Sequence, residues 1–214
     1  MPPIKSTIRR SLKSKAAKPI AWLVCLIPLS YLIAIGPDGW GANPVEMFNR
    51  FLGDWGLRGI LLTLCVTPLA NITGQSGFLR FRRLLGLFAF AYVCLHLSSY
   101  IIFDQFFDVA AIWKDIVKRN FITVGMLSFV LLVPLAVTST QGFKRRLGAK
   151  GWQRLHRLIY VIAMGGVLHN IMMVKANYVE AIIHAVILAA LLGWRISLSA
   201  SRVSIRDKQP EISA

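Results

Sequence analysis

The stretch of residues 152–175 (WQRLHRLIYVIAMGGVLHNIMMVK) is long and apolar enough to cross a membrane, yet it contains two histidines, His156 and His169. Hydrocarbon is a poor solvent for imidazole, so a histidine inside a span usually has a hydrogen-bond partner or a ligand. A step of thirteen residues separates the two histidines. In a helix this step is a rise of about 20 Å, most of the hydrocarbon thickness. Two ring nitrogens at two depths indicate ligands for one or two metal centres.

The whole chain has the composition of an integral membrane protein. Its 214 residues are 56% hydrophobic, with a mean hydropathy of +0.59. This length leaves no room for a separate soluble enzyme domain beside several spans. The net charge of +16 would suggest a nucleic-acid partner in a soluble protein. Here the basic residues lie between apolar runs, where they orient a membrane protein, so we expect no nucleic-acid binding.

The three cysteines give no sign of a metal or disulfide framework. Cys25, Cys65 and Cys94 each lie in a different apolar run, and no CxxC pair is present. The pattern therefore gives no support for a cysteine-ligated iron–sulfur or zinc site and favours core packing.

The apolar runs predict an all-α integral membrane bundle of six transmembrane helices. The expected spans are residues 19–35, 55–70, 84–103, 121–137, 152–175 and 178–194. They form one transmembrane domain, residues 19–195, between a basic segment at residues 1–18 and a polar tail at residues 196–214 that is loose at its end. No small-residue cleavage site follows the first run cleanly, so we expect a retained helix rather than a secretory signal. Trp113 and its neighbours predict a short interfacial helix.

The basic residues also predict the orientation. Six spans place both termini on one side of the membrane. The tails and the second and fourth loops hold 19 of the 25 Lys and Arg residues, and the other loops hold 6. Seven of the nine acidic residues lie on the less basic side. The positive-inside rule therefore predicts that both termini are cytoplasmic.

With this topology, His96 and His169 lie at a similar depth. His96 is eight residues before Asp104, and His169 is six residues before Lys175. The helical rise places them about 12 and 9 Å from the outer boundary, on helices that run in the same direction. Such a pair suits a six-coordinate haem, which needs one neutral imidazole on each face of its iron. Small residues suit the places where a flat macrocycle meets a helix, and the candidates are Gly86, Gly165 and Gly166.

The two other histidines have more than one interpretation. For His184, alone in the sixth span, a structural hydrogen bond is favoured over ligation. His156 lies near the inner edge beside Arg154 and Arg157. It is a candidate for a second haem ligand, for a flavin or quinone contact, or for an interfacial residue. The basic residues at 144–157 could hold a flavin phosphate, although orientation in the membrane explains them equally well.

Three segments together resemble a known family. RRLLGLFAFAYVCLHLSSYIIFD and GWQRLHRLIYVIAMGGVLHNIMMVK, with TPLAN before them, are similar to the MsrQ (YedZ) family, and the similarity covers all six spans. These are haem-binding inner-membrane subunits of bacterial methionine-sulfoxide repair systems, and their wider relatives are the ferric-reductase-like membrane domains. The resemblance implies haem b, flavin mononucleotide (FMN) and electrons from the quinone pool or a cytoplasmic flavin reductase. It implies, as recipient, a periplasmic molybdopterin methionine-sulfoxide reductase (MsrP-like) that restores oxidised proteins.

Carried over residue by residue, the resemblance places the haem-associated histidines at His96, His156 and His169. Arg83, thirteen residues before His96, stands where the two-haem relatives have a fourth histidine, so we count it as a cofactor-binding candidate. Thirteen residues also turn a helix by about 220° net. His156 and His169 therefore share one face only if the Gly165–Gly166 pair distorts the helix. We expect one bis-histidine haem, and the sequence does not settle a second.

The sequence thus predicts a membrane electron-transfer subunit that does not itself reduce the sulfoxide. No GxGxxG turn for a fused nucleotide-binding domain is present, so electrons must come from a membrane-soluble donor or a separate reductase. The alternatives are a stand-alone transmembrane ferric or quinone reductase, and a cofactor-free membrane transporter or scaffold.

Overall fold

The computed structural model describes residues 4–208, and this part of the chain is helical with short connections. The helices are α1 (Ile4–Lys13), α2 (Ala17–Ile35), α3 (Pro44–Thr73), α4 (Arg82–Ser99), α5 (Val109–Lys118), α6 (Asn120–Val137), α7 (Gln141–His156), α8 (Leu158–Met173) and α9 (Val179–Lys208), with the short turns η1 (Pro37–Trp40), η2 (Ser76–Phe81) and η3 (Tyr100–Asp104). Six helical segments are long and apolar enough to cross a membrane, as predicted. The polar tail was predicted to be loose at its end, and its last residues, 209–214, lie outside the described residues.

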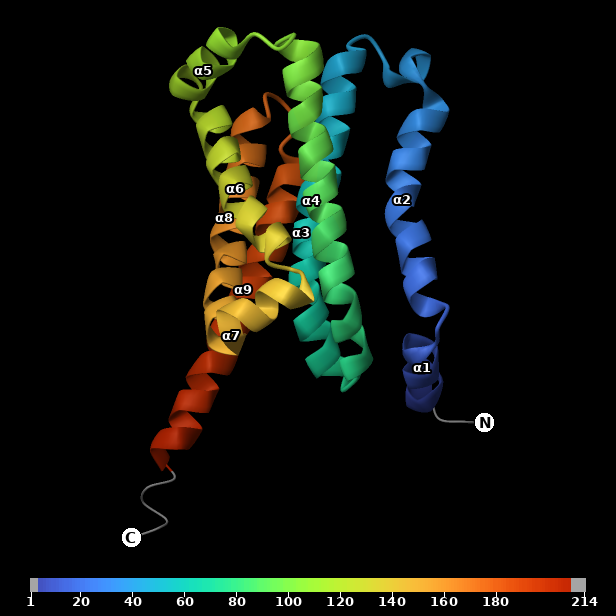
Figure 1. Ribbon diagram of the computed structural model, residues 1–214, viewed down its shortest axis with the longest axis vertical. Coiled ribbons are helices and arrows are strands. Elements are labelled where there is room, and N and C mark those ends of the chain that lie inside the picture. Colours follow the sequence, from blue (N-terminus) through green and yellow to red (C-terminus); the bar gives the residue numbers. More distant parts are fainter. Residues whose placement is uncertain (1–3, 209–214) are drawn as a thin grey trace.

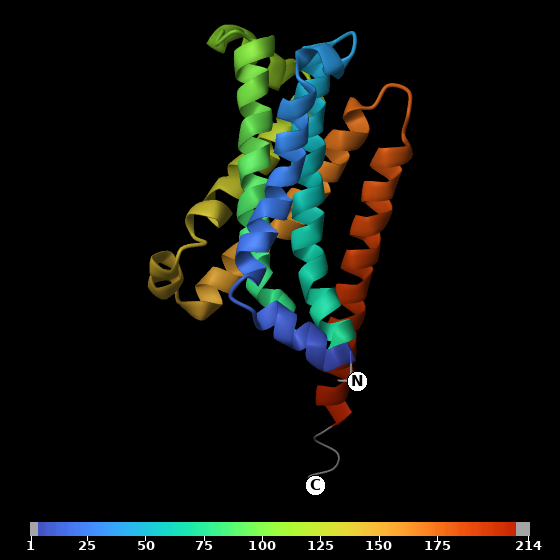
Figure 2. The same ribbon diagram turned by 90° about the vertical axis from the view of Figure 1, so that its right-hand side faces the viewer.

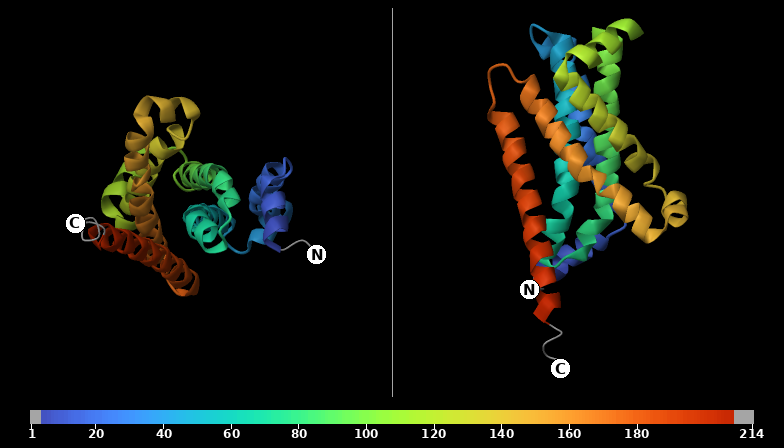
Figure 3. Two further views of the ribbon diagram at one scale, coloured as in Figure 1. Left: turned by 90° about the horizontal axis from the view of Figure 1, so that it is seen from below. Right: turned by 90° about the vertical axis from the view of Figure 1, so that its left-hand side faces the viewer.

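The spans form a bundle with α2 at its edge (Figure 1). Figure 2 shows α2 lying over the side formed by α3 and α4, and Figure 3 shows α6, α8 and α9 on the opposite side of that pair. α1 and the end of α9 lie at the lower end in Figure 1, whereas α5 and η1 lie at the upper end. We call the upper end the outer end and the lower end the inner end, following the orientation that the charges predict. The expected interfacial helix around Trp113 is α5.

The main core lies between α3, α4, α6, α8 and α9. Leu64, Ala89, Ile162 and Ala163 are almost completely buried within it. A second, smaller cluster joins α2 to α3 and α4, with Leu32 and Leu52 fully buried at its centre.

Tyr92 of α4 forms two hydrogen bonds with the backbone of α2 beside Pro28. Its hydroxyl donates to the carbonyl of Cys25 (2.8 Å) and accepts from the N–H of Leu29 (3.2 Å). These two groups would otherwise bond to each other across one turn, and Pro28 lies between them in the chain. Because a proline interrupts the helical ladder, the hydroxyl satisfies both backbone groups beside the interruption.

α3 is much longer than the predicted span at residues 55–70. It starts at Pro44, because the side chain of Asn43 accepts from the N–H of Glu46 (3.2 Å) and Pro44 is suited to the first turn. The charged residues before Trp55 suggested a loop, yet this segment continues the helix and buries Leu52.

Three glycines on α3 allow α4 to approach closely. Gly53, Gly56 and Gly59 recur every third residue and face His96, Val93 and Ala89 of α4, respectively. A Cβ atom on Gly56 would lie 2.7 Å from Val93 Cγ2, and one on Gly59 would lie 2.9 Å from Ala89 Cβ. Close approach at small residues is a usual basis for helix packing in membranes.

The predicted span at residues 152–175 is not one regular helix. α7 ends at His156 and α8 begins at Leu158, with a tight bond from the N–H of Arg157 to the carbonyl of Arg154 (3.2 Å). The helix is thus interrupted at Arg157, between His156 and His169, whereas α8 runs through Gly165 and Gly166 without a break. Gly165 instead lies against Ser128 of α6, and a Cβ on Gly166 would lie 3.2 Å from Leu57 of α3. Gly86 likewise lies against Thr63, so all three glycines serve helix packing.

A matched pair of alanine substitutions tests the glycine contact. We expect Gly59→Ala to destabilise the protein by about 1–3 kcal/mol, because the new methyl overpacks the α3–α4 contact. Gly193→Ala in α9 has nothing within 4 Å of the added atom, so it should be neutral or stabilise by up to about 1 kcal/mol. Unfolding in mixed detergent micelles measures both variants. Equal stability of the two variants would contradict the packing role of Gly59.

Candidate functional site

His96 of α4 and His169 of α8 meet inside the outer half of the bundle. Their ring centroids are 6.2 Å apart, and the ring planes are inclined by 72°. A metal–imidazole bond is about 2 Å long and a ring nitrogen lies about 1 Å from its centroid, so two imidazoles on opposite sides of one metal have centroids about 6 Å apart. The spacing of the pair therefore fits a single metal ion between the rings.

Both imidazoles are held in the tautomer that suits a metal ligand. His96 Nδ1 lies 2.9 Å from the backbone oxygen of Asn49, and His169 Nδ1 lies 2.7 Å from that of Phe121. A carbonyl oxygen only accepts, so each Nδ1 carries the proton and donates. Each Nε2 then keeps its lone pair for a metal, as a ligating histidine requires.

A glycine accompanies each of these carbonyls four residues later. Gly53 follows Asn49 and lies against the ring of His96, and Gly125 follows Phe121 and lies against the ring of His169. A Cβ at either position would come within 2.9–3.0 Å of Nδ1. A side chain here would therefore block the ring from its carbonyl. Neither glycine was predicted from the sequence. Each could have been found as a glycine in another span at about the depth of the histidine.

The donor set of this site fits a haem better than a bare metal ion. Within residues 4–208, no group of three or more His, Cys, Asp or Glu side chains is arranged to hold a metal ion. Two axial imidazoles are sufficient for haem iron, because the macrocycle supplies the other ligands. The chain's own residues thus provide an axial pair and an apolar surrounding.

His156 lies apart from this pair, near the inner end. Its ring stacks on Trp152, with centroids 3.9 Å apart and planes inclined by 26°. Its Nε2 lies 3.2 Å from Thr138 Oγ1. The structure therefore does not bring His156 together with a second histidine.

The arginine beside His156 is Arg82, whereas the predicted Arg83 is exposed. Arg82 interacts electrostatically with His156, and also with Arg195 and Tyr160. One residue of shift turns a helix by about 100°, so Arg82 and Arg83 lie on different sides of α4.

Arg195 of α9 enters the same inner region. Its guanidinium donates to the hydroxyl of Tyr160, lies 4.9 Å from that ring's centroid, and is 3.4 Å from the carbonyl of Leu64. Arg195 Nε and Thr67 Oγ1 are the two buried side-chain polar atoms without a hydrogen-bond partner among the described residues. The three ion pairs in the described part of the chain, Glu46–Arg50, Arg58–Glu180 and Asp115–Arg119, all lie elsewhere. The inner region thus combines two guanidiniums for which residues 4–198 supply no carboxylate in an ion pair.

His184, for which a structural hydrogen bond was favoured, is only 4% exposed. Its Nδ1 lies 3.4 Å from Asn170 Oδ1, and Asn170 Nδ2 donates to Asp54 Oδ1 at 3.1 Å. These hydrogen-bonded side chains join α9, α8 and α3, and they do not include His96 or His169.

Comparison with known proteins agrees with this architecture. Residues 52–167 match the family model described as ferric reductase like transmembrane component. A protein of Rhodospirillum rubrum is 56% identical over 82% of this chain and 85% of its own length. One of Caulobacter vibrioides is 51% identical over 83% of this chain and 85% of its own length, and one of Xanthomonas campestris pv. campestris is 44% identical over 94% and 96%.

Each of these relatives is named protein-methionine-sulfoxide reductase heme-binding subunit MsrQ. The family match and the six apolar spans make this chain a multi-pass membrane protein. It belongs to the MsrQ family, with a ferric-reductase-like transmembrane domain.

Proposed function

We propose that this protein is a haem b electron-transfer subunit of the bacterial inner membrane. It passes electrons from the quinone pool or a flavin donor outward to a periplasmic molybdopterin methionine-sulfoxide reductase, which repairs oxidised periplasmic proteins. The catalytic reduction of the sulfoxide belongs to that partner. The observation that carries the proposal is the His96–His169 pair, with ring centroids 6.2 Å apart and both Nδ1 atoms bonded to backbone carbonyls.

Haem, when bound between these rings, supplies one-electron chemistry. His96 and His169 would hold it through Nε2, and the carbonyls of Asn49 and Phe121 fix both rings and raise their basicity. Each ring is already oriented by its hydrogen bond, so the chain presents both Nε2 atoms in fixed positions.

Replacing either ligand tests the assignment. We expect His96→Ala and His169→Ala each to remove most of the bound haem, because one axial bond and its orienting hydrogen bond are lost together. The low-spin visible spectrum and a pyridine haemochrome assay of purified protein measure the loss. His156→Ala is the control and should keep the haem of the outer half. Full low-spin spectra in both ligand variants would refute the assignment.

The inner region supports an anionic cofactor, and we assign FMN to it. Arg82 and Arg195 lie close to each other without a carboxylate partner among the described residues. A phosphate accepts several charge-assisted hydrogen bonds from guanidiniums, and Arg195 Nε, which has no hydrogen-bond partner among the described residues, suits such an acceptor. Trp152 and His156 provide a stacked aromatic surface nearby. FMN held here would receive electrons from a cytoplasmic flavin reductase.

Substitutions of two neighbouring arginines distinguish FMN binding from a general effect of positive charge on membrane orientation. We expect Arg82→Gln to lower the FMN content several-fold, because it removes one of the two inner guanidiniums. Arg83→Gln removes the same charge from an exposed position and should leave the FMN content unchanged. Fluorescence of flavin released by denaturation measures both variants. Equal FMN in the two variants would contradict the assignment of Arg82.

His156→Ala should slow reduction of the haem from the inner side while retaining the outer haem. His156 precedes α8, and the rise along α8 from Leu158 to His169 alone is about 17 Å, so the substitution acts on entry of the electron rather than on haem binding. Stopped-flow reduction by a flavin reductase gives the rate. Loss of all haem from a folded variant would show that the division into an inner and an outer site is wrong.

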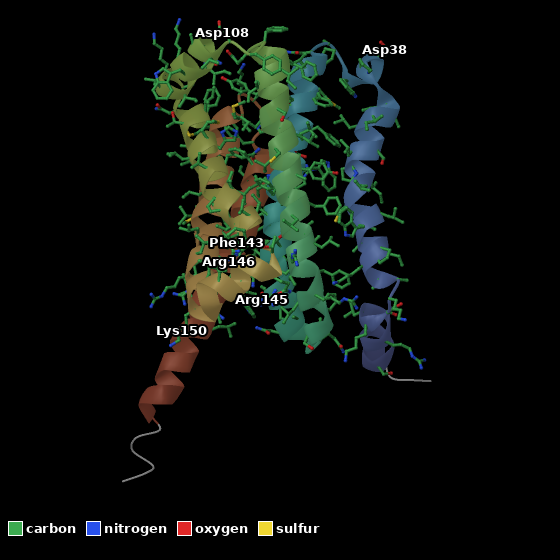
Figure 4. The ribbon with its side chains drawn as sticks, viewed as in Figure 1. Asp38, Asp108, Phe143, Arg145, Arg146 and Lys150 are labelled. Carbon is green, nitrogen blue, oxygen red and sulfur yellow. The ribbon has the colours of Figure 1, made fainter. Side chains whose placement is uncertain are left out.

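The orientation of the chain supports delivery of electrons outward. Figure 4 shows Asp38 and Asp108 at the outer end, and Arg145, Arg146 and Lys150 toward the inner end. This distribution agrees with the 19 to 6 division of basic residues and with the positive-inside rule. The acidic residues Asp38, Glu46, Asp54, Asp104, Asp108 and Asp115 can also steer a partner that carries a basic patch.

Electron transfer in oriented vesicles tests this direction. The reduced protein should transfer electrons to the reductase added at the outer face, and the double variant Asp38→Asn/Asp108→Asn should slow association at low salt only. The rate of haem oxidation is the readout. Transfer only at the inner face would overturn the direction, and reductase activity without any periplasmic partner would favour a stand-alone ferric or quinone reductase.

A further inference from the structure

A second chemical site lies next to the histidine pair, in the hydrogen-bonded chain of His184, Asn170 and Asp54. The three residues come from α9, α8 and α3. Asn170, the middle member of this hydrogen-bonded group, directly follows the proposed ligand His169 in the sequence. Neither the histidine pair nor the inner region uses these side chains. A buried titratable histidine in a membrane span is costly to maintain and usually has a function.

The hydrogen bonds among these three side chains are all donated in the direction from His184 to Asp54. Asn170 Nδ2 donates to Asp54 Oδ1, which leaves the Asn170 carbonyl oxygen to accept from His184 Nδ1. His184 Nδ1 therefore carries a proton and Nε2 keeps a free lone pair. Protonation at Nε2 gives an imidazolium whose N–H bond, relayed by the amide, points toward a carboxylate. Such an arrangement stabilises the charged ring.

One end of the chain reaches water. Asp54 lines a hollow of about 380 Å³ on α3, together with Asn43, Glu46, Met47, Arg50 and Phe51. Glu46 and Arg50 lie at the outer end of α3 with about half of each side chain exposed. His184, in contrast, is buried. Asp54 thus connects the outer aqueous face with a titratable group inside the bundle.

The charges near His184, Asn170 and Asp54 favour the uptake of one proton by this group. Asp54 interacts with Arg58, Glu180, His184 and Arg50, and His184 interacts with Asp54, Arg58 and Glu180. Arg58 and Glu180 neutralise each other in an ion pair of 3.0 Å, and α8 contributes the uncharged Asn170. With Asp54 ionised and His184 neutral, the three side chains His184, Asn170 and Asp54 together carry one negative charge. Uptake of one proton makes it neutral.

We propose that His184, Asn170 and Asp54 form a proton-accepting relay that is coupled to reduction of the haem held by His96 and His169. The inference rests on the haem ligation proposed above. For each electron that a reduced flavin or quinol gives up to the haem iron, His184 takes one proton at Nε2 from water of the outer face, and the Asn170 amide with the ionised Asp54 stabilises the imidazolium that forms. When the electron leaves to the acceptor, the proton returns. The added electron favours the proton because charges interact strongly where water is excluded.

The midpoint potential of the haem, titrated between pH 5 and 8, tests the relay. Full coupling changes the potential by about 59 mV for each tenfold change in proton concentration. We expect the wild-type protein to approach this slope within the range where His184 titrates. His184→Gln and Asp54→Asn should each give a nearly flat profile. Glu46→Gln, which removes an exposed carboxylate from the same helix, should keep the wild-type slope.

Three results would overturn the relay: a flat wild-type profile, an unchanged slope in either relay variant, or loss of the slope in Glu46→Gln. A low-spin spectrum is recorded for every variant first. If His184→Gln fails to bind haem, Asp54→Asn decides alone, because an amide oxygen at residue 54 still accepts from Asn170. A normal spectrum with a pH-independent potential refutes only the relay, whereas retention of haem in His96→Ala and His169→Ala refutes the proposed ligation.

Discussion

The arrangement of the site depends on two hydrogen bonds from imidazole N–H groups to helical carbonyls. A carbonyl in a helix already accepts one bond from the residue four positions later, but its oxygen has a second lone pair. The side chain at that later position would normally cover it. In α3 and α6 the position is glycine, at Gly53 and Gly125, so the rings of His96 and His169 reach the carbonyls of Asn49 and Phe121. The same local solution thus occurs twice, once for each ring, and it orients both Nε2 atoms.

This requirement extends into the packing of the whole bundle. A ring can bond to a neighbouring helix only if the two helices approach closely, and glycines on α3 and α8 provide that approach. Gly56 and Gly59 continue the line of Gly53 along α4, while Gly165 lies against Ser128 of α6. Helix association in a membrane relies on such contacts, because lipid supplies no hydrophobic driving force between helices. The glycines that position the rings and those that pack the spans therefore belong to the same interfaces.

The sequence was sufficient to predict the six spans and the shared depth of His96 and His169, because apolar runs and helical rise depend only on local pattern. It was not sufficient for α3, whose charged outer part resembles a loop but forms helix from Pro44 onward. It also gave no sign of Arg82, since the position of a side chain around a helix depends on neighbours that the sequence does not reveal. Gly53 and Gly125 were missed for the same reason: their role exists only where another helix places a ring against them. Local periodicity thus predicts the elements, whereas tertiary contact decides the members of the site.

The two halves of the bundle differ in how their charges are compensated. The ion pairs Glu46–Arg50, Arg58–Glu180 and Asp115–Arg119 all lie toward the outer end, so the protein itself supplies both signs there. Toward the inner end Arg82 and Arg195 approach each other, and no ion pair of the described residues includes them. Two cations in a medium of low polarity repel each other strongly unless an anion joins them. Among the described residues, the outer half therefore contains charges of both signs in ion pairs, whereas the two inner guanidiniums have no carboxylate in an ion pair. This difference is why we assign an uncharged ligation role to the outer histidines and a phosphate-bearing cofactor to the inner arginines.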